Sequence, residues 1–155
     1  MDQADLVHEE EDTQSGKYLT FFVDGMQYGI GIRHVTEIIG VQPINSLPEV
    51  PIFIKGIINL RGKIIPVMDM RLRFGKAEVP YTDRTCIVVA ETERLTAGLI
   101  VDQVSEVIVI DEQNVEAPPD VQGDSRYICG IGKTGTEVTL LLDCERLFDG
   151  TDNQH

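Results

Sequence analysis

This chain of 155 residues contains no tryptophan, and only 6% of its residues are aromatic. Proteins that bind single-stranded nucleic acids usually combine aromatic side chains with a basic surface, so this composition argues against that class. Basic residues are scarce: 13 lysines and arginines stand against 26 acidic residues, which gives a formal net charge of −13. Such a charge repels phosphate backbones and anionic lipid headgroups. We therefore expect no nucleic-acid partner and no direct membrane contact.

The chain also lacks long apolar runs and a cysteine framework. Its longest apolar stretches, residues 64–68 and 107–110, are far shorter than the roughly 20 residues that a membrane helix needs. No basic segment followed by an apolar one opens the chain, so no secretory signal is predicted. Three widely spaced cysteines, Cys86, Cys129 and Cys144, argue against disulfides or a metal clip and favour a reducing cytoplasm.

The negative charge is concentrated at the start of the chain. Residues 1–16 contain six acidic residues and no basic one, whereas the remainder carries 20 acidic against 13 basic residues. Residues 1–16 also lack a periodic apolar pattern, so we predict an acidic flexible tail there. A second short tail is predicted at 151–155.

The rest of the sequence repeats itself. Residues 29–39 read GIGIRHVTEII and residues 98–108 read GLIVDQVSEVI, an ungapped match. A second match has its offset moved from 69 to 74: Gly56, Ile57, Asp69 and Phe74 recur as Gly130, Ile131, Asp143 and Phe148. The repeat predicts a fold of two like halves, with five extra residues in a connecting loop of the second half.

Most of the pattern predicts short β-strands. In the first half we expect strands at 20–23, 26–32, 35–41, 55–60 and 63–68. In the second half we expect them at 85–90, 95–101, 104–110, 127–132 and 138–142. Asp24-Gly25 and Arg61-Gly62 are expected to form hairpin turns. Asp69 and Asp143 are expected to cap short helices ending at Phe74 and Phe148.

A flat sheet of five short strands would leave one apolar face in water, whereas a small closed barrel buries that face and removes the exposed edges. We therefore predict a mainly β protein with one domain over 17–150, in which a first barrel at about 17–79 packs against a second at about 80–150.

The two halves differ at the turn of their last hairpin. Residues 59–62 read NLRG, and residues 133–136 read KTGT. The second set is ordinary turn chemistry, whereas the first places an aliphatic side chain beside a guanidinium, a combination that suits a protein interface. Two interpretations remain open: a contact patch, or a plain turn in which Leu60 folds inward and Arg61 is solvated.

Residues 35–38 read VTEI, and residues 53–69 read FIKGIINLRGKIIPVMD. This long, ungapped pattern resembles the CheW-like chemotaxis coupling proteins, and the resemblance extends from about Lys17 to Phe148. It implies two intertwined five-stranded SH3-like barrels that exchange terminal elements. It also implies a non-catalytic adaptor that couples the cytoplasmic tips of chemoreceptors to the regulatory domain of the histidine kinase CheA, within cytoplasmic receptor arrays.

The resemblance also implies functional residues. In the family, the glutamate of the V-x-E-I strand and the arginine of the turn are tied to receptor coupling, and these are Glu37 and Arg61 here. Val35 lies on the same strand face as Glu37, because strand side chains two apart point the same way. The predicted receptor-binding set is Val35, Glu37, Ile57, Leu60, Arg61 and Gly62.

The kinase contact is expected in the longer connecting segment of the second half, at 111–126. Some relatives carry a basic residue and a bulky aromatic there, whereas this chain has Glu116 and Val121. With Asp120 these form the predicted kinase-binding set, and a proline-stiffened surface loop is the alternative for the segment.

No pattern indicates catalysis. His8, His34 and His155 lack the spacing of metal ligands, and the chain has neither a G-x-S-x-G nucleophile motif nor a phosphate-binding glycine loop. We therefore predict that the chain is not an enzyme and has no cofactor, metal or catalytic residue. The alternative class is a β-barrel that binds a small ligand or an oligonucleotide.

Overall fold

The computed structural model describes residues 16–118 and 127–149. The predicted tails at 1–16 and 151–155 lie outside this range, apart from Gly16. Asp120 and Val121, from the predicted kinase-binding set, also lie outside it. Within the described residues, no helix is long and apolar enough to cross a membrane.

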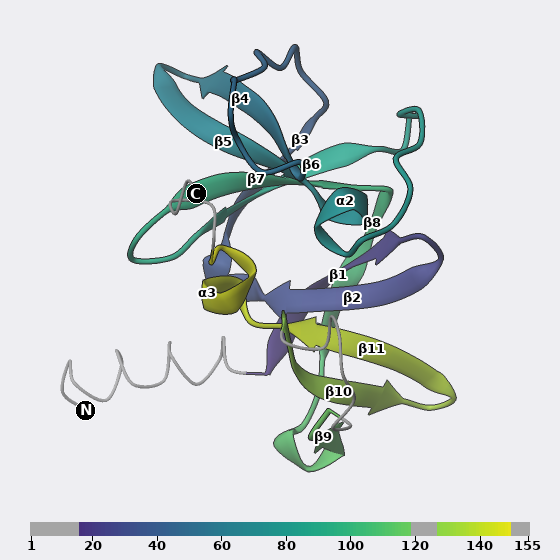
Figure 1. Ribbon diagram of the computed structural model, residues 1–155. Coiled ribbons are helices and arrows are strands. Elements are labelled where there is room, and N and C mark those ends of the chain that lie inside the picture. The colour runs from purple at the N-terminus through teal and green to yellow at the C-terminus, as the bar shows by residue number, and fades with distance from the viewer. Residues whose placement is uncertain (1–15, 119–126, 150–155) are drawn as a thin grey trace, which may run out of the picture.

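The described residues form two β-sheets, which confirms the prediction of a mainly β fold (Figure 1). The six-stranded sheet has the order β8-β1-β2-β11-β10-β9. Its strands are β8 (Gln103–Val109), β1 (Lys17–Val23), β2 (Met26–Gly31), β11 (Glu137–Leu142), β10 (Ile128–Thr134) and β9 (Val115–Glu116). The five-stranded sheet has the order β3-β6-β7-β5-β4. Its strands are β3 (Val35–Gly40), β6 (Cys86–Glu91), β7 (Thr96–Val101), β5 (Lys63–Asp69) and β4 (Ile54–Leu60).

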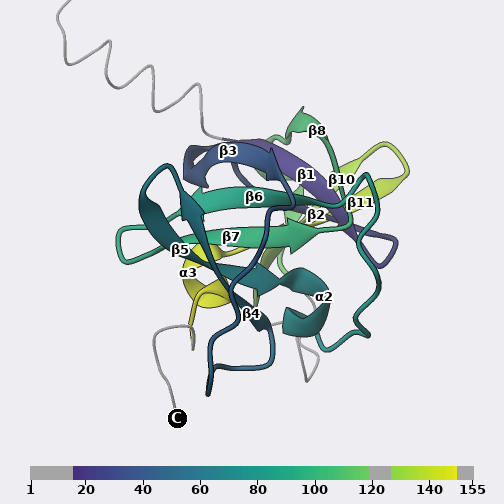
Figure 2. The ribbon, with the colours of Figure 1, turned by 90° about the horizontal axis from the view of Figure 1, so that it is seen from above.

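Each sheet combines strands from both halves of the sequence. The hairpin β1–β2 joins the second-half strand β11 by parallel pairing, with Gly29 opposite Leu141. The hairpin β6–β7 joins the first-half strand β5 in the same way, with Gly98 opposite Val67. Figure 2 shows β6 and β7 running between β3 and β5. The two halves are therefore interleaved.

Two hairpin turns use left-handed backbone, as the sequence predicts. Asp24 and Gly25 have φ of 53° and 79°, and Arg61 and Gly62 have φ of 52° and 89°. Positive φ at both central residues is typical of the type I′ turn, whose twist matches that of the flanking strands. These turns therefore fix the register of β1 with β2 and of β4 with β5.

One short helix follows the last strand of each half. The carboxylate of Asp69 accepts hydrogen bonds from the first turn of α2 (Met70–Arg73), and that of Asp143 does the same for α3 (Cys144–Leu147). Each aspartate satisfies amide groups that a helix leaves without internal partners. Both helices lie in the region between the two sheets (Figure 1).

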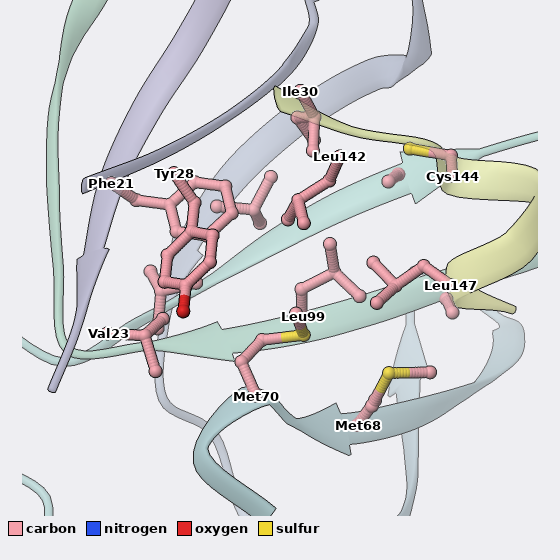
Figure 3. Close-up of a cluster of buried hydrophobic side chains, with 14 of the residues drawn as sticks. Phe21, Val23, Tyr28, Ile30, Met68, Met70, Leu99, Leu142, Cys144 and Leu147 are labelled. Atoms are coloured by element: carbon pink, nitrogen blue, oxygen red, sulfur yellow. The ribbon is translucent and has the colours of Figure 1, made fainter. Parts of the chain in front are cut away.

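The main buried cluster lies between the sheets, where side chains from β1, β2, β5, β7 and α3 meet (Figure 3). It includes Phe21, Tyr28, Met68, Leu99 and Leu147. A second cluster occupies the other face of the five-stranded sheet and is built from Ile58, Ile65, Val67, Ile87, Val89 and Ile100. The central strands β6 and β7 are buried on both faces, so they read as apolar runs rather than alternating ones.

One part of the fold differs from the prediction. The six-stranded sheet has one strand more than the predicted five, because the two-residue strand β9 adds to its edge. A strand this short produces no apolar alternation, so the sequence carries no signal for it. It follows the short 3₁₀ turn η2 (Glu112–Asn114) and lies within the longer connecting segment of the second half.

Candidate functional site

The residues predicted for receptor coupling include one ion pair, between Glu37 on β3 and Arg61 at the turn between β4 and β5. A nitrogen of the Arg61 guanidinium donates to a carboxylate oxygen of Glu37. The two residues are 24 positions apart in sequence and belong to the two opposite edges of the five-stranded sheet. The pair therefore links edges that no backbone pairing joins among the described residues.

The turn holds Arg61 in position. Its φ of 52° is in the left-handed region, and the Gly62 amide donates to the side-chain oxygen of Asn59 at 2.8 Å. This bond is a local side-chain to backbone contact of the kind that stabilises turns. It fixes the backbone from which the Arg61 side chain extends.

Arg61 is the accessible member of the pair. Its side chain is 69% exposed, against 28% for Glu37. The hydrogen bond and the negative charge of Glu37 raise the pKa of Arg61, so the guanidinium stays charged. The arrangement presents a cation, oriented by a half-buried carboxylate, on the protein surface.

The other residues of the predicted set do not all gather at this pair. Leu60 folds inward and packs against the second apolar cluster, whose members include Ile58. Ile57 is half-buried on the alternate face of β4, where it pairs with Pro66 and bridges to Asn45. Leu60 is partly buried and Arg61 is 69% exposed, as the plain-turn interpretation describes, but Arg61 is also paired with Glu37.

Val35 lies nearer the centre of the molecule than the sequence suggests. The register of β3 with β6 shifts between Val35 and Glu37, which marks a β-bulge. Val35 packs against the main cluster between the sheets. Because of the bulge, the side chains of Val35 and Glu37 do not follow the regular alternation of a strand.

The equivalent place in the second half lacks this ion pair. Gly135 takes the position of Arg61, with a φ of 62°. Glu106, the counterpart of Glu37, is exposed, and its backbone exchanges hydrogen bonds with the Thr20 side chain at 2.7 and 3.1 Å. The two halves have the same strand pairing here but different surface chemistry.

Glu116 is the described member of the predicted kinase-binding set. It lies on β9 opposite Ile131 and forms an ion pair with Lys133 of the neighbouring strand β10. Both side chains are more than half exposed. This pair lies at the outer edge of the six-stranded sheet.

Sequence reasoning missed two arginines of α2. Arg71 forms a bidentate contact with Asp102, with nitrogen to oxygen distances of 2.8 and 3.0 Å, and a longer contact of 3.3 Å with Asp24. Arg73 is 8% exposed and contacts the end of α3. Arginines in a short helix normally face solvent, so only the alignment of Arg73 with the apolar Leu147 hinted at its burial.

No group of three or more histidine, cysteine, aspartate or glutamate residues within the described ranges is arranged to hold a metal ion. Cys144 is buried, and burial, with the nearby negative charges, raises its pKa to about 12. Such a thiol stays protonated at neutral pH and is a poor nucleophile.

A family model described as "CheW-like domain" matches residues 17–152. The chemotaxis protein CheW of Rhizobium meliloti is 33% identical over 145 residues, which cover 92% of this chain and 94% of the relative. The CheW protein of Klebsiella aerogenes is 32% identical over 143 residues, covering 91% and 86%. The crystal structure of the scaffolding protein TtCheW from Thermoanaerobacter tengcongensis has a TM-score of 0.83 and 39% identity, with 90% of this chain and 97% of that chain covered.

Proposed function

This chain belongs to the CheW-like family and is a non-catalytic chemotaxis scaffold, and we propose that it bridges the cytoplasmic tips of chemoreceptors to the regulatory domain of the kinase CheA. Family membership confirms the predicted adaptor function and the prediction that the chain is not an enzyme. Family membership also favours this function over the alternative of a ligand-binding or oligonucleotide-binding barrel.

The observation that supports the receptor site best is the Glu37–Arg61 pair. A surface arginine fixed by a turn and oriented by a carboxylate presents its remaining donors in a defined direction. Arginine is enriched at protein interfaces for this reason. We therefore assign receptor docking to the surface around this pair, with the predicted set of Val35, Glu37, Ile57, Leu60, Arg61 and Gly62 forming or supporting it.

Exposed apolar side chains on strands of the same sheet suit a helical partner. Ile38 follows Glu37 on β3 and is 44% exposed, and Ile64 on β5 is 56% exposed. An amphipathic helix binds through apolar anchors together with polar contacts at the rim. The receptor tip would supply this helix, and Arg61 would contact its acidic or carbonyl groups.

We assign the kinase contact to the opposite side of the chain, where Glu116 lies at the edge of the six-stranded sheet. An edge strand offers unpaired backbone groups, and a β-rich partner can pack against it. Asp120 and Val121 of the predicted set continue this segment in sequence. Separate surfaces for the two partners would allow one chain to contact both.

The test is a reconstituted assay with receptor-containing membranes, CheA and the purified chain. We expect kinase autophosphorylation to rise only when all three are present, and Arg61→Ala to lose at least tenfold of that activation. Arg94→Ala is the matched control, because Arg94 is likewise an exposed arginine that forms ion pairs with carboxylates. Equal loss in both variants, or full activation by Arg61→Ala, would contradict the assigned receptor site.

A further inference from the structure

Arg73 connects the two short helices of the molecule. It is the last residue of α2 and is 8% exposed. Its Nε and Nη2 atoms donate to the carbonyl oxygen of Leu147 at 3.1 and 2.9 Å, and Nη2 donates to that of Asp149 at 2.7 Å. These carbonyl groups belong to the end of α3, where a helix has no internal donors for them. An arginine from the first half of the chain therefore caps a helix of the second half.

The same guanidinium is held by two aromatic rings. Its central carbon lies 4.2 Å from the ring centre of Phe53 and 4.4 Å from that of Tyr127. Both distances are well inside the range in which a cation is attracted to a ring face. Phe53 immediately precedes β4 of the five-stranded sheet, and Tyr127 immediately precedes β10 of the six-stranded sheet.

Phe53 and Tyr127 are equivalent residues of the repeat. The Asp69 amide donates to the Phe53 carbonyl at 2.8 Å, and the Asp143 amide donates to the Tyr127 carbonyl at 2.9 Å. The offset of 74 that relates Asp69 to Asp143 also relates these two aromatic residues. The guanidinium of Arg73 thus binds one ring from each copy of the same structural unit.

The residue equivalent to Arg73 is Leu147, which ends α3 and is fully buried. The repeat is broken at the place where its two copies meet. Two arginines here would bring like charges together in a buried space, which is costly. Two leucines would remove the donors that Arg73 gives to the carbonyl groups of Leu147 and Asp149.

We infer that Arg73 is a positioning residue that fixes the orientation of the five-stranded sheet relative to the six-stranded sheet. It reaches from the helix after β5 to the helix after β11 and contacts the residues that immediately precede β4 and β10. The planar fork of arginine suits this task, because it donates in its plane and stacks on both faces.

The orientation of the sheets matters for the proposed function, and this part of the inference rests on it. The assigned receptor surface lies on the five-stranded sheet at Glu37 and Arg61, and the assigned kinase surface lies on the six-stranded sheet at Glu116. A bridge must hold its two surfaces at one angle. Arg73 is buried between the helices, so it would act on docking through this angle.

The test measures residual dipolar couplings of backbone amides in the free, full-length chain. For the unchanged protein we expect one alignment tensor to fit both sheets. For Arg73→Leu we expect each sheet to fit its own tensor while the common fit fails. A common fit with unchanged values in Arg73→Leu would overturn the inference. If Arg73→Leu does not fold, Arg73→Lys is measured with the same expectation, because lysine keeps the charge but lacks the fork.

The double variant Arg73→Leu/Leu147→Arg distinguishes a bridge between the sheets from a local effect on α2. It moves the guanidinium to the equivalent position, where Phe53 and Tyr127 would exchange roles. We expect the common alignment to return. If the couplings of the double variant fit each sheet separately but not both sheets together, the bridging role is contradicted. Because the couplings need no partner, a failure of the proposed function leaves this result unaffected.

Discussion

Glu37 and Arg61 join the two edges of one sheet. In the order β3-β6-β7-β5-β4, Glu37 lies on the strand at one edge, and Arg61 directly follows the strand at the other. The link therefore consists of an exposed side-chain contact in addition to the apolar cluster beneath it, which includes Ile58 and Ile65. The same contact that helps to close this side of the sheet also orients the arginine assigned to receptor docking.

The first prediction separates stability from docking. Exposed ion pairs contribute little to folding, because solvent screens the charges and two long side chains lose freedom. We expect Arg61→Ala to change the melting temperature by no more than about 2 °C, while receptor coupling falls strongly. Circular dichroism melting and the reconstituted kinase assay measure the two effects. A large fall in melting temperature would indicate that the residue is mainly structural.

Charge reversal extends the first prediction by testing the pair itself. Glu37→Arg and Arg61→Glu should each place like charges together at this position, whereas the double variant should restore an attractive pair. We expect the double variant to melt at the temperature of the unchanged protein. Failure of the double variant to improve on either single variant would mean that the direct contact is unimportant for the sheet edges.

The elements with local chemical signals were predictable from the sequence. Asp24-Gly25 and Arg61-Gly62 form the predicted turns, and Asp69 and Asp143 cap the predicted helices. These features depend on a few neighbouring residues, so short motifs identify them.

Features that depend on distant partners were not visible in the local pattern. The parallel pairing of β2 with β11 and of β7 with β5 joins strands that are far apart in the chain, so no periodicity reports it. The inward position of Leu60 and the burial of Arg73 likewise depend on packing against other strands and helices. Tertiary packing decides such positions, and propensity does not.

The second prediction concerns the equivalent glycines of β4 and β10. Gly56 has a φ of 149°, and a Cβ atom there would lie 2.0 Å from the backbone oxygen of Asn45. We expect Gly56→Ala to reduce the free energy of unfolding by about 3 kcal/mol or more, because strained backbone and a backbone clash add. Urea denaturation measures the loss.

Gly130 provides the matched control. A Cβ atom at Gly130 would lie 2.7 Å from a methyl group of Val115, a side chain that can move. We expect Gly130→Ala to cost about 1–2 kcal/mol, as overpacking usually does. Equal losses for the two variants would show that the bridge between Asn45 and Ile57 adapts more easily than its backbone hydrogen bonds suggest.

The third prediction is that two aspartates change the pH dependence of the free energy of unfolding in opposite directions. Burial alone would raise the pKa of Asp102, but hydrogen bonds from Arg71 and the Asp24 amide, together with the charge of Arg71, bring it below its usual value. A lowered pKa contributes stability above the unfolded value of about 3.9 and loses it as the pH falls through the folded pKa. Asp102→Asn should therefore reduce the loss of stability in acid.

Asp69 should behave in the opposite way. Burial raises the pKa of Asp69, although hydrogen bonds from the Leu72 and Arg71 amides oppose the shift. The folded protein then binds a proton at Asp69 more readily than the unfolded chain does, which adds stability as the pH falls through the raised folded pKa toward the unfolded value of about 3.9. Asp69→Asn, which keeps a capping oxygen, should steepen the acid transition. Urea midpoints from pH 6 to pH 2.5 measure both slopes, and slopes of the same sign for the two variants would contradict the argument.

The fourth prediction compares ion pairs at equivalent hairpin-to-helix junctions. In one junction Asp24 of the β1–β2 turn contacts Arg71 of α2, and in the other Arg94 of the β6–β7 turn contacts Glu145 of α3. The charges of turn and helix are exchanged between the junctions. Each hairpin therefore meets an opposite charge at its own helix and would meet a like charge at the other, which favours one arrangement of the interleaved hairpins.

Arg71 also binds Asp102, and we expect burial to make this contact stronger than that of Arg94 with Glu145. The side chains of Arg71 and Asp102 are 17% and 30% exposed, whereas those of Arg94 and Glu145 are 47% and 52% exposed. A double-mutant cycle to alanine should give a coupling energy of about 1.5–3 kcal/mol for Arg71 with Asp102, whose hydrogen bonds are charge-assisted and bidentate. The same cycle should give about 0.2–1 kcal/mol for Arg94 with Glu145. In 1 M salt the second coupling should nearly vanish while the first is largely kept, because screening acts mainly on exposed charges. Equal couplings, or equal salt sensitivity, would mean that the partial burial of Arg71 does not strengthen its contact.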